Sequence, residues 1–176
     1  IVTALLQSIH DERIDLEEKQ GNLYLKTASS RESKINGLTP SDFPNFPQIK
    51  KTHTFLVGSH PLREALERVL PAVSLSEFKP EFTGIFWKVG GTTLHLVATD
   101  TFRLAEEKIT LPQKINTPPF SFILPHNVAQ ELTRILGEEE SVLVSVGENQ
   151  VLFETGGVRV ISRLIDGNFP EYSAII

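Results

Sequence analysis

Apolar and polar positions follow two different periods along residues 52–111, and the change of period predicts the elements of this stretch. The segment THTFLV at 52–57 is rich in β-branched and aromatic residues, which is typical of a strand. In SHPLREALERVL at 59–70 the apolar residues recur at helical spacing, and they are Leu62, Ala65, Leu66 and Val69. Three more strands are predicted at 82–89, 92–98 and 102–111. The stretch therefore reads as strand, helix, strand, strand, strand.

Glycine, proline and short polar residues mark the connections between these strands. A turn is predicted at Gly90-Gly91 and a second one at residues 99–101. The segment PQKINTPP at 112–119 is expected to be a loop that ends the stretch. The next stretch repeats the plan, with a strand at 120–124, a helix at 126–136 and strands at 141–146, 150–155 and 158–165.

The repetition is also visible letter by letter. Residues 56–70 match residues 122–136 at an offset of 66, which pairs His60 with His126 and Leu66 with Leu132. At a larger offset of 126, INGLTPSDFPNF at 35–46 matches ISRLIDGNFPEY at 161–172. We therefore predict that residues 48–176 form one domain of two similar halves, and that residues 1–47 are the second half of a preceding copy.

Composition narrows the class of protein. The 176 residues are 40% hydrophobic with a net charge of −5, which suffices for globular cores and argues against a protein that is basic overall. A local basic strip is still possible. There is no cysteine, so disulfides, thiolate chemistry and zinc fingers are excluded and a cytoplasmic protein is expected, with no membrane segment. The chain begins with Ile1 and has no Met, so we expect a piece of a longer protein.

Acidic and histidine side chains near the second turn could form an acid/base or metal site. The residues concerned are His95, Asp100, Glu106 and Glu107. Alternation along these strands sends His95 and its neighbours to opposite faces, and no pair has a recognised ligand spacing. We therefore expect no catalytic residue, no metal and no cofactor.

Four cations lie on or beside the two predicted helices: Arg63, Arg68, Lys79 and Arg134. Glu64, Glu67 and Glu131 lie close to them in the sequence and offset their charge. From the residues alone, a solvated surface with salt bridges is favoured over a binding surface.

Two segments, 98–105 and 167–176, place apolar groups beside turns. The apolar residues are Phe102, Leu104, Phe169, Pro170, Tyr172 and Ile175. One interpretation is ordinary turn and core packing. The other is an apolar groove for a partner peptide, with Arg103 at its rim.

These segments resemble a known family, the bacterial DNA polymerase III beta subunits, which are sliding clamps. VATDTFRLA at 97–105 is similar to the family signature T-D-x-[aromatic or His]-R-L-A. SRLIDGNFPEY at 162–172 is similar to its S-[KR]-L-[IV]-D-G-x-F-P-[DE]-Y signature, which is highly specific. KPEFTGIFW at 79–87 is similar to the family's R-P-x-L-x-G-[VI] strand, so the resemblance extends over the whole chain.

The resemblance implies an α+β DNA-clamp fold, in which repeated strand-helix-strand-strand-strand half-units place their helices on one face of antiparallel sheets. It implies an intact subunit of three domains. Residues 1–47 would be the C-terminal half of the first domain and residues 48–176 the second, middle domain, with the third domain absent from this chain. Two subunits would close head to tail into a ring around duplex DNA, without catalysis or cofactor.

The resemblance also implies two sets of binding residues. The family's groove, which takes linear peptides of the DNA polymerase III alpha subunit and the clamp loader, falls on Phe82, Thr99, Thr101, Phe102, Arg103, Leu104, Pro170 and Ile175. The cations of the inner side, which would meet DNA phosphates, are Arg63, Arg68, Lys79 and Arg134. Thr101-Phe102 and Ser173-Ala174 depart from the commonest family pattern, which concerns groove shape and peptide preference.

Two other classes remain open from the residues themselves. The first is a repeat-built peptide-binding scaffold that does not act on DNA. The second is an acid/base hydrolase that uses Asp100. Retention on circular but not linear DNA separates the clamp from the scaffold, and turnover lost in an Asp100→Asn variant would indicate the hydrolase.

Overall fold

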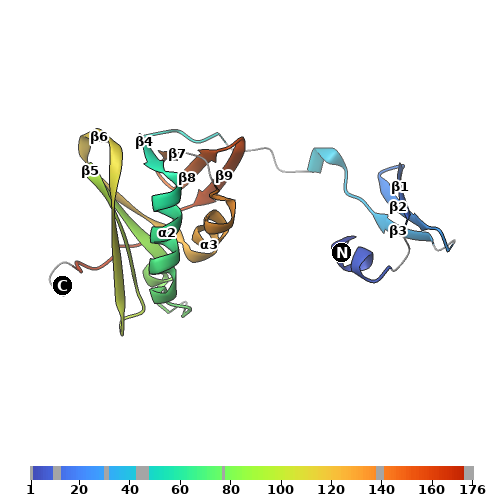
Figure 1. Cartoon of the computed structure of the whole chain (residues 1–176), viewed down its shortest axis with the longest axis horizontal. Coiled ribbons are helices and arrows are strands. Elements are labelled where there is room, and N and C mark those ends of the chain that lie inside the picture. Colours follow the sequence, from blue (N-terminus) through green and yellow to red (C-terminus); the bar gives the residue numbers. More distant parts are fainter. Residues whose placement is uncertain are drawn as a thin grey trace. The chain divides into compact units, whose positions relative to one another are not determined.

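The chain is described by a computed structural model that places residues 2–9, 13–29, 32–42, 48–76, 78–137 and 141–172. The chain forms two compact units that divide after Pro47 (Figure 1). The division falls where the repeat pattern predicts it, and the assignment of the units to successive clamp domains stays a prediction. Among the described residues, no helix has the length and apolar character needed to cross a membrane.

The first unit is a small antiparallel sheet with a short helix. Its elements are α1 (Val2–Gln7), β1 (Ile14–Lys19), β2 (Asn22–Thr27), β3 (Glu32–Asn36) and the 3₁₀ helix η1 (Pro40–Asp42). The strands are ordered β1-β2-β3, and Leu25 on β2 is only 1% exposed. Residues 43–46, which belong to the 35–46 repeat, lie outside the described residues.

The second unit carries the repeated elements. They are β4 (His53–Gly58), α2 (Ser59–Val69), η2 (Leu70–Ala72), η3 (Pro80–Phe82), β5 (Gly84–Thr99), β6 (Leu104–Pro125), α3 (His126–Ile135), β7 (Ser141–Val146), β8 (Gln150–Thr155) and β9 (Val158–Arg163). Both helices begin at the predicted residues. One sheet has the order β4-β7-β8-β9, and β5 pairs with β6 in the other.

The strands of the two halves pair reciprocally. β4, the first strand of its half, pairs antiparallel with β7 of the other half, with Phe55 opposite Val144. In the same way the end of β6 pairs with the start of β5, with Phe122 opposite Trp87. Each half therefore contributes its first strand to the sheet of the other half, as expected of two similar halves related by an approximate twofold axis.

Two predicted connections belong to strands in the structure. β6 runs through residues 112–119, so the prediction of a loop there is wrong. The turn predicted at Gly90-Gly91 lies inside β5, and the chain reverses there, because Tyr172 contacts Phe86 and shares the Glu106 carboxylate with His95, nine residues further along β5. Gly91 has a positive φ of 58° and lies opposite Ile115, with a register shift on each side of it. The Thr93 hydroxyl donates to the Gly90 carbonyl at 3.1 Å. The two glycines thus permit the reversal of β5.

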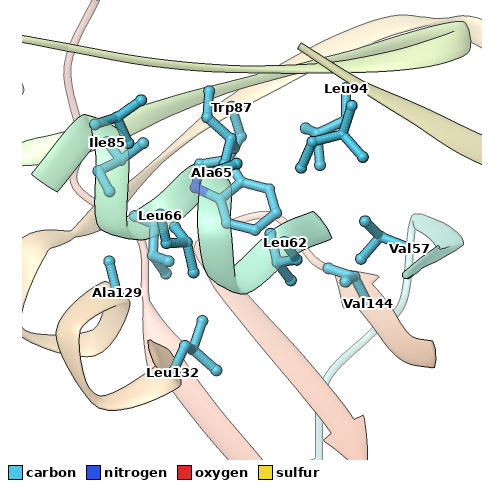
Figure 2. Packing of buried hydrophobic residues seen from close by; sticks show 14 of the residues in the cluster. Val57, Leu62, Ala65, Leu66, Ile85, Trp87, Leu94, Ala129, Leu132 and Val144 are labelled. Carbon is cyan, nitrogen blue, oxygen red and sulfur yellow. The ribbon is translucent and has the colours of Figure 1, made fainter. Parts of the chain in front are cut away.

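The core of the second unit lies between the helices and the sheets. Figure 2 shows Leu66 from α2 and Leu132 from α3 among the same buried side chains as Trp87 of β5. All three residues are 0% exposed. Leu66 and Leu132, which the offset of 66 pairs, are therefore both buried, as two similar halves require.

The sheet formed by β5 and β6 has a second face that the helices do not cover. Ile85 and Trp87 are buried in the core, so Phe86 between them points to the opposite face. The C-terminal segment 164–172 covers part of that face, where the ring of Phe169 stacks on Phe86 with centroids 4.7 Å apart. This face carries part of the predicted partner-binding set, including Phe82 and Pro170.

Candidate partner-binding and DNA-facing sites

The turn between β5 and β6 is closed by the side chains of its own residues. Thr99 donates its hydroxyl to the Arg103 carbonyl at 2.8 Å and accepts the Thr101 amide at 3.1 Å. Asp100 accepts the backbone N–H groups of Phe102 and Arg103, both at 3.0 Å, and the Arg103 Nε at 2.8 Å. Side-chain acceptors of this kind fix the backbone of a turn. The turn therefore has one defined conformation.

The same bonds set the ionisation of Asp100. The backbone N–H of Arg103 contributes most, followed by the Arg103 side chain and the Phe102 N–H, and together they hold the pKa of Asp100 below its usual value. The carboxylate is thus charged at neutral pH, and its oxygens accept hydrogen bonds from the other residues of the turn. This makes Asp100 a structural residue of the turn rather than a candidate base.

The turn presents an aromatic side chain to solvent. Phe102 is 97% exposed, while Thr99 at the base of the turn is only 8% exposed. Thr101 has a φ of 79°, a left-handed conformation that is uncommon for threonine. An exposed aromatic group on a constrained turn is typical of a binding surface.

Four aromatic rings meet on the face of the β5–β6 sheet that lies away from the helices. We call them the aromatic cluster: Phe82, Phe86, Phe169 and Tyr172. Phe169 stacks on Phe86 at 4.7 Å and meets Phe82 edge to face at 5.9 Å. Tyr172 meets Phe86 at 6.2 Å and Phe169 at 6.4 Å, again edge to face. Aromatic pairs in these geometries are favourable beyond the area they bury. The cluster holds residues 169–172 against the sheet.

Polar contacts reinforce this attachment. The Tyr172 hydroxyl donates to the Glu106 Oε1 atom at 3.1 Å, and His95 Nδ1 lies 2.8 Å from the same oxygen. The bond from His95, and then the bond from Tyr172, lower the pKa of Glu106 against its partial burial. Burial, and then the bond to Glu106, raise the pKa of Tyr172 to about 12.

The contact between His95 and Glu106 corrects the expectation that strand alternation separates His95 from its acidic neighbours. Alternation applies along one strand, whereas these residues come from two paired strands, in which Val97 lies opposite Glu106 and Lys108 lies opposite His95. Diagonal neighbours on one face of an antiparallel pair are within reach of each other. The register of β5 on β6 was the missing information. In the described part of the chain, no group of three His, Asp or Glu residues could hold a metal ion.

The structure brings part of the predicted groove together on one face. Glu106, which binds Tyr172, is two residues after Leu104 on β6, so both point to the same side of the strand. Pro170 is two residues before Tyr172 and lines a hollow of about 240 Å³ together with Phe86. The strand that follows the turn and the C-terminal segment therefore meet on this face.

The remaining groove residues differ in accessibility. Phe82 is 7% exposed and Thr99 is 8% exposed, so in the predicted groove both would lie at the base rather than along an exposed side. Thr101, Phe102 and Arg103 are exposed. Ile175 lies outside the described residues. The convergence of all eight residues into one groove stays a prediction.

The three arginines predicted to face DNA lie on the solvent-exposed sides of the two helices. Each of them pairs with a glutamate. On α2, Arg63 Nε lies 3.0 Å from Glu67 Oε1 and Arg68 Nη2 lies 3.6 Å from Glu64 Oε2. Arg68 also reaches Glu107 of β6 at 3.3 Å. These pairs are exposed, so each contributes little to stability.

The third arginine and the lysine complete the set. On α3, Arg134 Nη1 lies 2.9 Å from Glu131 Oε1 and its side chain is 67% exposed. Lys79 lies in the segment before η3, where its ammonium group is 5.3 Å from the centroid of the Phe82 ring. Lys79 therefore lies beside the aromatic cluster, and its role towards DNA stays a prediction along with that of the arginines.

Residues 57–171 match a known family, described as the DNA polymerase III beta subunit, central domain. The matched range begins in β4 and ends one residue before Tyr172. It therefore includes both helices, the turn and most of the C-terminal segment.

Relatives with curated names carry the same description. The beta sliding clamp of Bacillus subtilis (strain 168) is 32% identical over 166 residues, which are 93% of this chain and 43% of that protein. The beta sliding clamp of Staphylococcus aureus (strain N315) is 32% identical over 148 residues, which are 84% of this chain and 39% of that protein. The chain thus spans less than half the length of these relatives.

Solved structures agree with the fold. A crystal structure of the DNA polymerase sliding clamp from Bacillus subtilis superposes with a TM-score of 0.82 at 29% identity, covering 99% of this chain and 46% of that one. A DnaN sliding clamp from Pseudomonas aeruginosa bound to griselimycin gives a TM-score of 0.83 at 26% identity, covering 99% and 47% of the two chains. The predicted α+β clamp fold is confirmed.

Proposed function

Because the chain belongs to the DNA polymerase III beta subunit family, with residues 57–171 matching its central domain, we propose that it is part of a sliding clamp. This clamp is a processivity factor that encircles duplex DNA and tethers the replicative polymerase in the bacterial cytoplasm. Residues 1–47 are the end of its first domain and residues 48–176 its second domain. A third domain and a second, head-to-tail subunit complete the ring.

The observation that carries this proposal is the doubled half-unit of the second domain. The reciprocal pairing of β4 with β7 and of β5 with β6 places α2 and α3 side by side (Figure 1). Sheets that share strands between the two halves form one continuous layer, with the helices along one side of it. Repeated around a ring, such a layer presents helices to the DNA and sheets to the solvent.

The ion pairs on the helices suit a surface that slides. Arg63, Arg68 and Arg134 are charged and exposed, and each has a glutamate partner whose attraction is weak in water. A DNA phosphate can therefore replace the glutamate at little cost, and the arginine can return to it afterwards. Such contacts between arginine and phosphate do not depend on the DNA sequence, and their affinity falls as the salt concentration rises. The ring itself, rather than affinity, keeps the clamp on DNA.

The partners of this clamp are the DNA polymerase III alpha subunit and the clamp loader, which bind it through short linear peptides. Phe102 offers an exposed aromatic anchor, Leu104 and Pro170 supply apolar walls, and Arg103 at the rim meets polar groups of the peptide. The clamp has no catalytic residue, metal or cofactor of its own.

Primer extension on a circular, singly primed template tests this function. The polymerase and loader are expected to make long products only when the longer protein containing this chain is present. A Leu104→Ala/Pro170→Ala variant should support only short products, while its content of folded protein, followed by Trp87 fluorescence, stays unchanged. A Leu75→Ala variant is the control, because Leu75 is 85% exposed and lies outside the groove set. Products of equal length with and without the protein would contradict the proposal.

A further inference from the structure

Three polar side chains meet beneath the C-terminal segment. One oxygen of Glu106 lies 2.8 Å from His95 Nδ1 and 3.1 Å from the Tyr172 hydroxyl. A carboxylate only accepts hydrogen bonds, so both partners donate and His95 carries a proton on Nδ1. The three residues come from β5, β6 and the segment after β9. A single carboxylate oxygen therefore joins the C-terminal segment to both strands of the sheet.

The three side chains are partly buried. The side chains of His95 and Glu106 are 23% and 27% exposed, and Tyr172 is 6% exposed. Phe86 and Phe169 pack edge to face with the Tyr172 ring. Hydrogen bonds to an ionised acceptor are stronger than neutral ones, and partial burial strengthens them further. These bonds are therefore worth more than the exposed ion pairs on the helices.

The position of these residues relates them to the groove. Tyr172 is two residues after Pro170, and Glu106 is two residues after Leu104 on the same face of β6. The bond between Tyr172 and Glu106 thus ties the segment that carries Pro170 to the strand that carries Leu104. If this bond opens, residues 169–172 lose their hydrogen bond to β6 and keep the ring contacts of Phe169 and Tyr172.

We propose that His95, Glu106 and Tyr172 form a latch that positions Pro170 beside Leu104 and so sets the affinity of the groove for its peptide. The nature of the ligand rests on the proposed function, whereas the latch depends only on the contacts described above. The three are positioning residues, and none of them needs to touch the peptide. An open latch reduces the fraction of molecules with a complete groove, which weakens the apparent affinity by that fraction.

The charges that face the latch define its dependence on pH. Glu106 is near His95, Tyr172 and Lys108, and Tyr172 is also near Glu171. The pKa of Glu106 is lowered from its ordinary value of 4.5, so the stabilisation is complete above that value and is lost as the pH falls through the lowered pKa. In a Glu106→Gln variant this acid transition should disappear.

The latch is tested first by amide exchange of segment 164–172, measured by mass spectrometry on the full chain. A Tyr172→Phe variant removes only the hydroxyl and keeps the ring. Its segment is expected to exchange about ten- to a hundredfold faster, the loss expected for one hydrogen bond to a charged group. The control is Tyr24→Phe, since Tyr24 is the other of the two tyrosines and lies in the first unit. Unchanged exchange in Tyr172→Phe would overturn the latch, whether or not a peptide binds.

Peptide affinity is the second measurement, made on the longer protein with a fluorescent peptide from the alpha subunit. Tyr172→Phe and Glu106→Gln should each weaken binding by up to that same factor, and the double variant should be no weaker than the worse single variant, because both act on the Tyr172–Glu106 bond. Additive losses, or unchanged affinity in Tyr172→Phe, would overturn the inference. A wild-type protein that binds no peptide would instead contradict the proposed function.

Discussion

Truncating Leu66 or Leu132 to alanine is expected to lower the free energy of unfolding of the second unit by nearly the same amount. Each leucine is 0% exposed and faces the same core from its own helix. Removing three carbon atoms from such a site loses about 2 kcal/mol of transfer free energy, and the cavity left behind adds about 1 kcal/mol. The expected loss is therefore about 3 kcal/mol for either variant.

The assay is urea unfolding followed by tryptophan fluorescence. Trp87 is the sole tryptophan, is 0% exposed and packs against Phe122 with ring centroids 5.3 Å apart, so its emission reports this core. The matched control is Leu75→Ala, the same chemical change at a residue that is 85% exposed, and it should leave the midpoint unchanged. A large loss in one core variant and none in the other would refute the equivalence of the two halves.

Three further predictions concern the binding surfaces. Because bonds from Arg103 and Phe102 hold the pKa of Asp100 below its ordinary value of 3.8, the turn should stay closed as the pH falls to about 4 and open below it. Peptide anisotropy against pH should show this transition, and Asp100→Asn should bind weakly at every pH because an amide oxygen cannot replace both carboxylate oxygens. A Leu104→Ala/Pro170→Ala variant should lose peptide binding yet keep the sedimentation coefficient of the closed dimer. Reversing the charges of Arg63, Arg68, Lys79 and Arg134 should impair DNA loading most at low salt, where repulsion from the phosphates is least screened, and normal loading at low salt would refute their assignment.

The helices of the second unit were predictable because their apolar residues keep one period over several turns. Leu62, Ala65, Leu66 and Val69 are all buried, and α2 begins at Ser59 as the sequence predicts. The ion pairs of α2 were predictable for the same reason, since residues four apart are neighbours on any helix. Local periodicity was sufficient for both.

The irregular part of the sheet was not predictable from local signals. The prolines and polar residues at 112–119 are typical of a loop, but the segment belongs to β6, where Ile115 lies opposite Gly91, a partner 24 residues away in the sequence. The contact between His95 and Glu106 has the same cause, since it depends on the register of two strands. Motif resemblance located the turn and the C-terminal segment, but it contained no sign of the Tyr172 contact that joins them.

The central claim is that the protein containing this chain holds DNA by encircling it. The most direct measurement loads the protein onto a nicked circular plasmid, raises the salt until electrostatic contacts are screened, and then linearises half of the sample with a single-cutting nuclease. The account predicts that the protein stays on the intact circles and slides off the linear molecules. Equal release from circular and linear DNA, or equal retention on both, would contradict it.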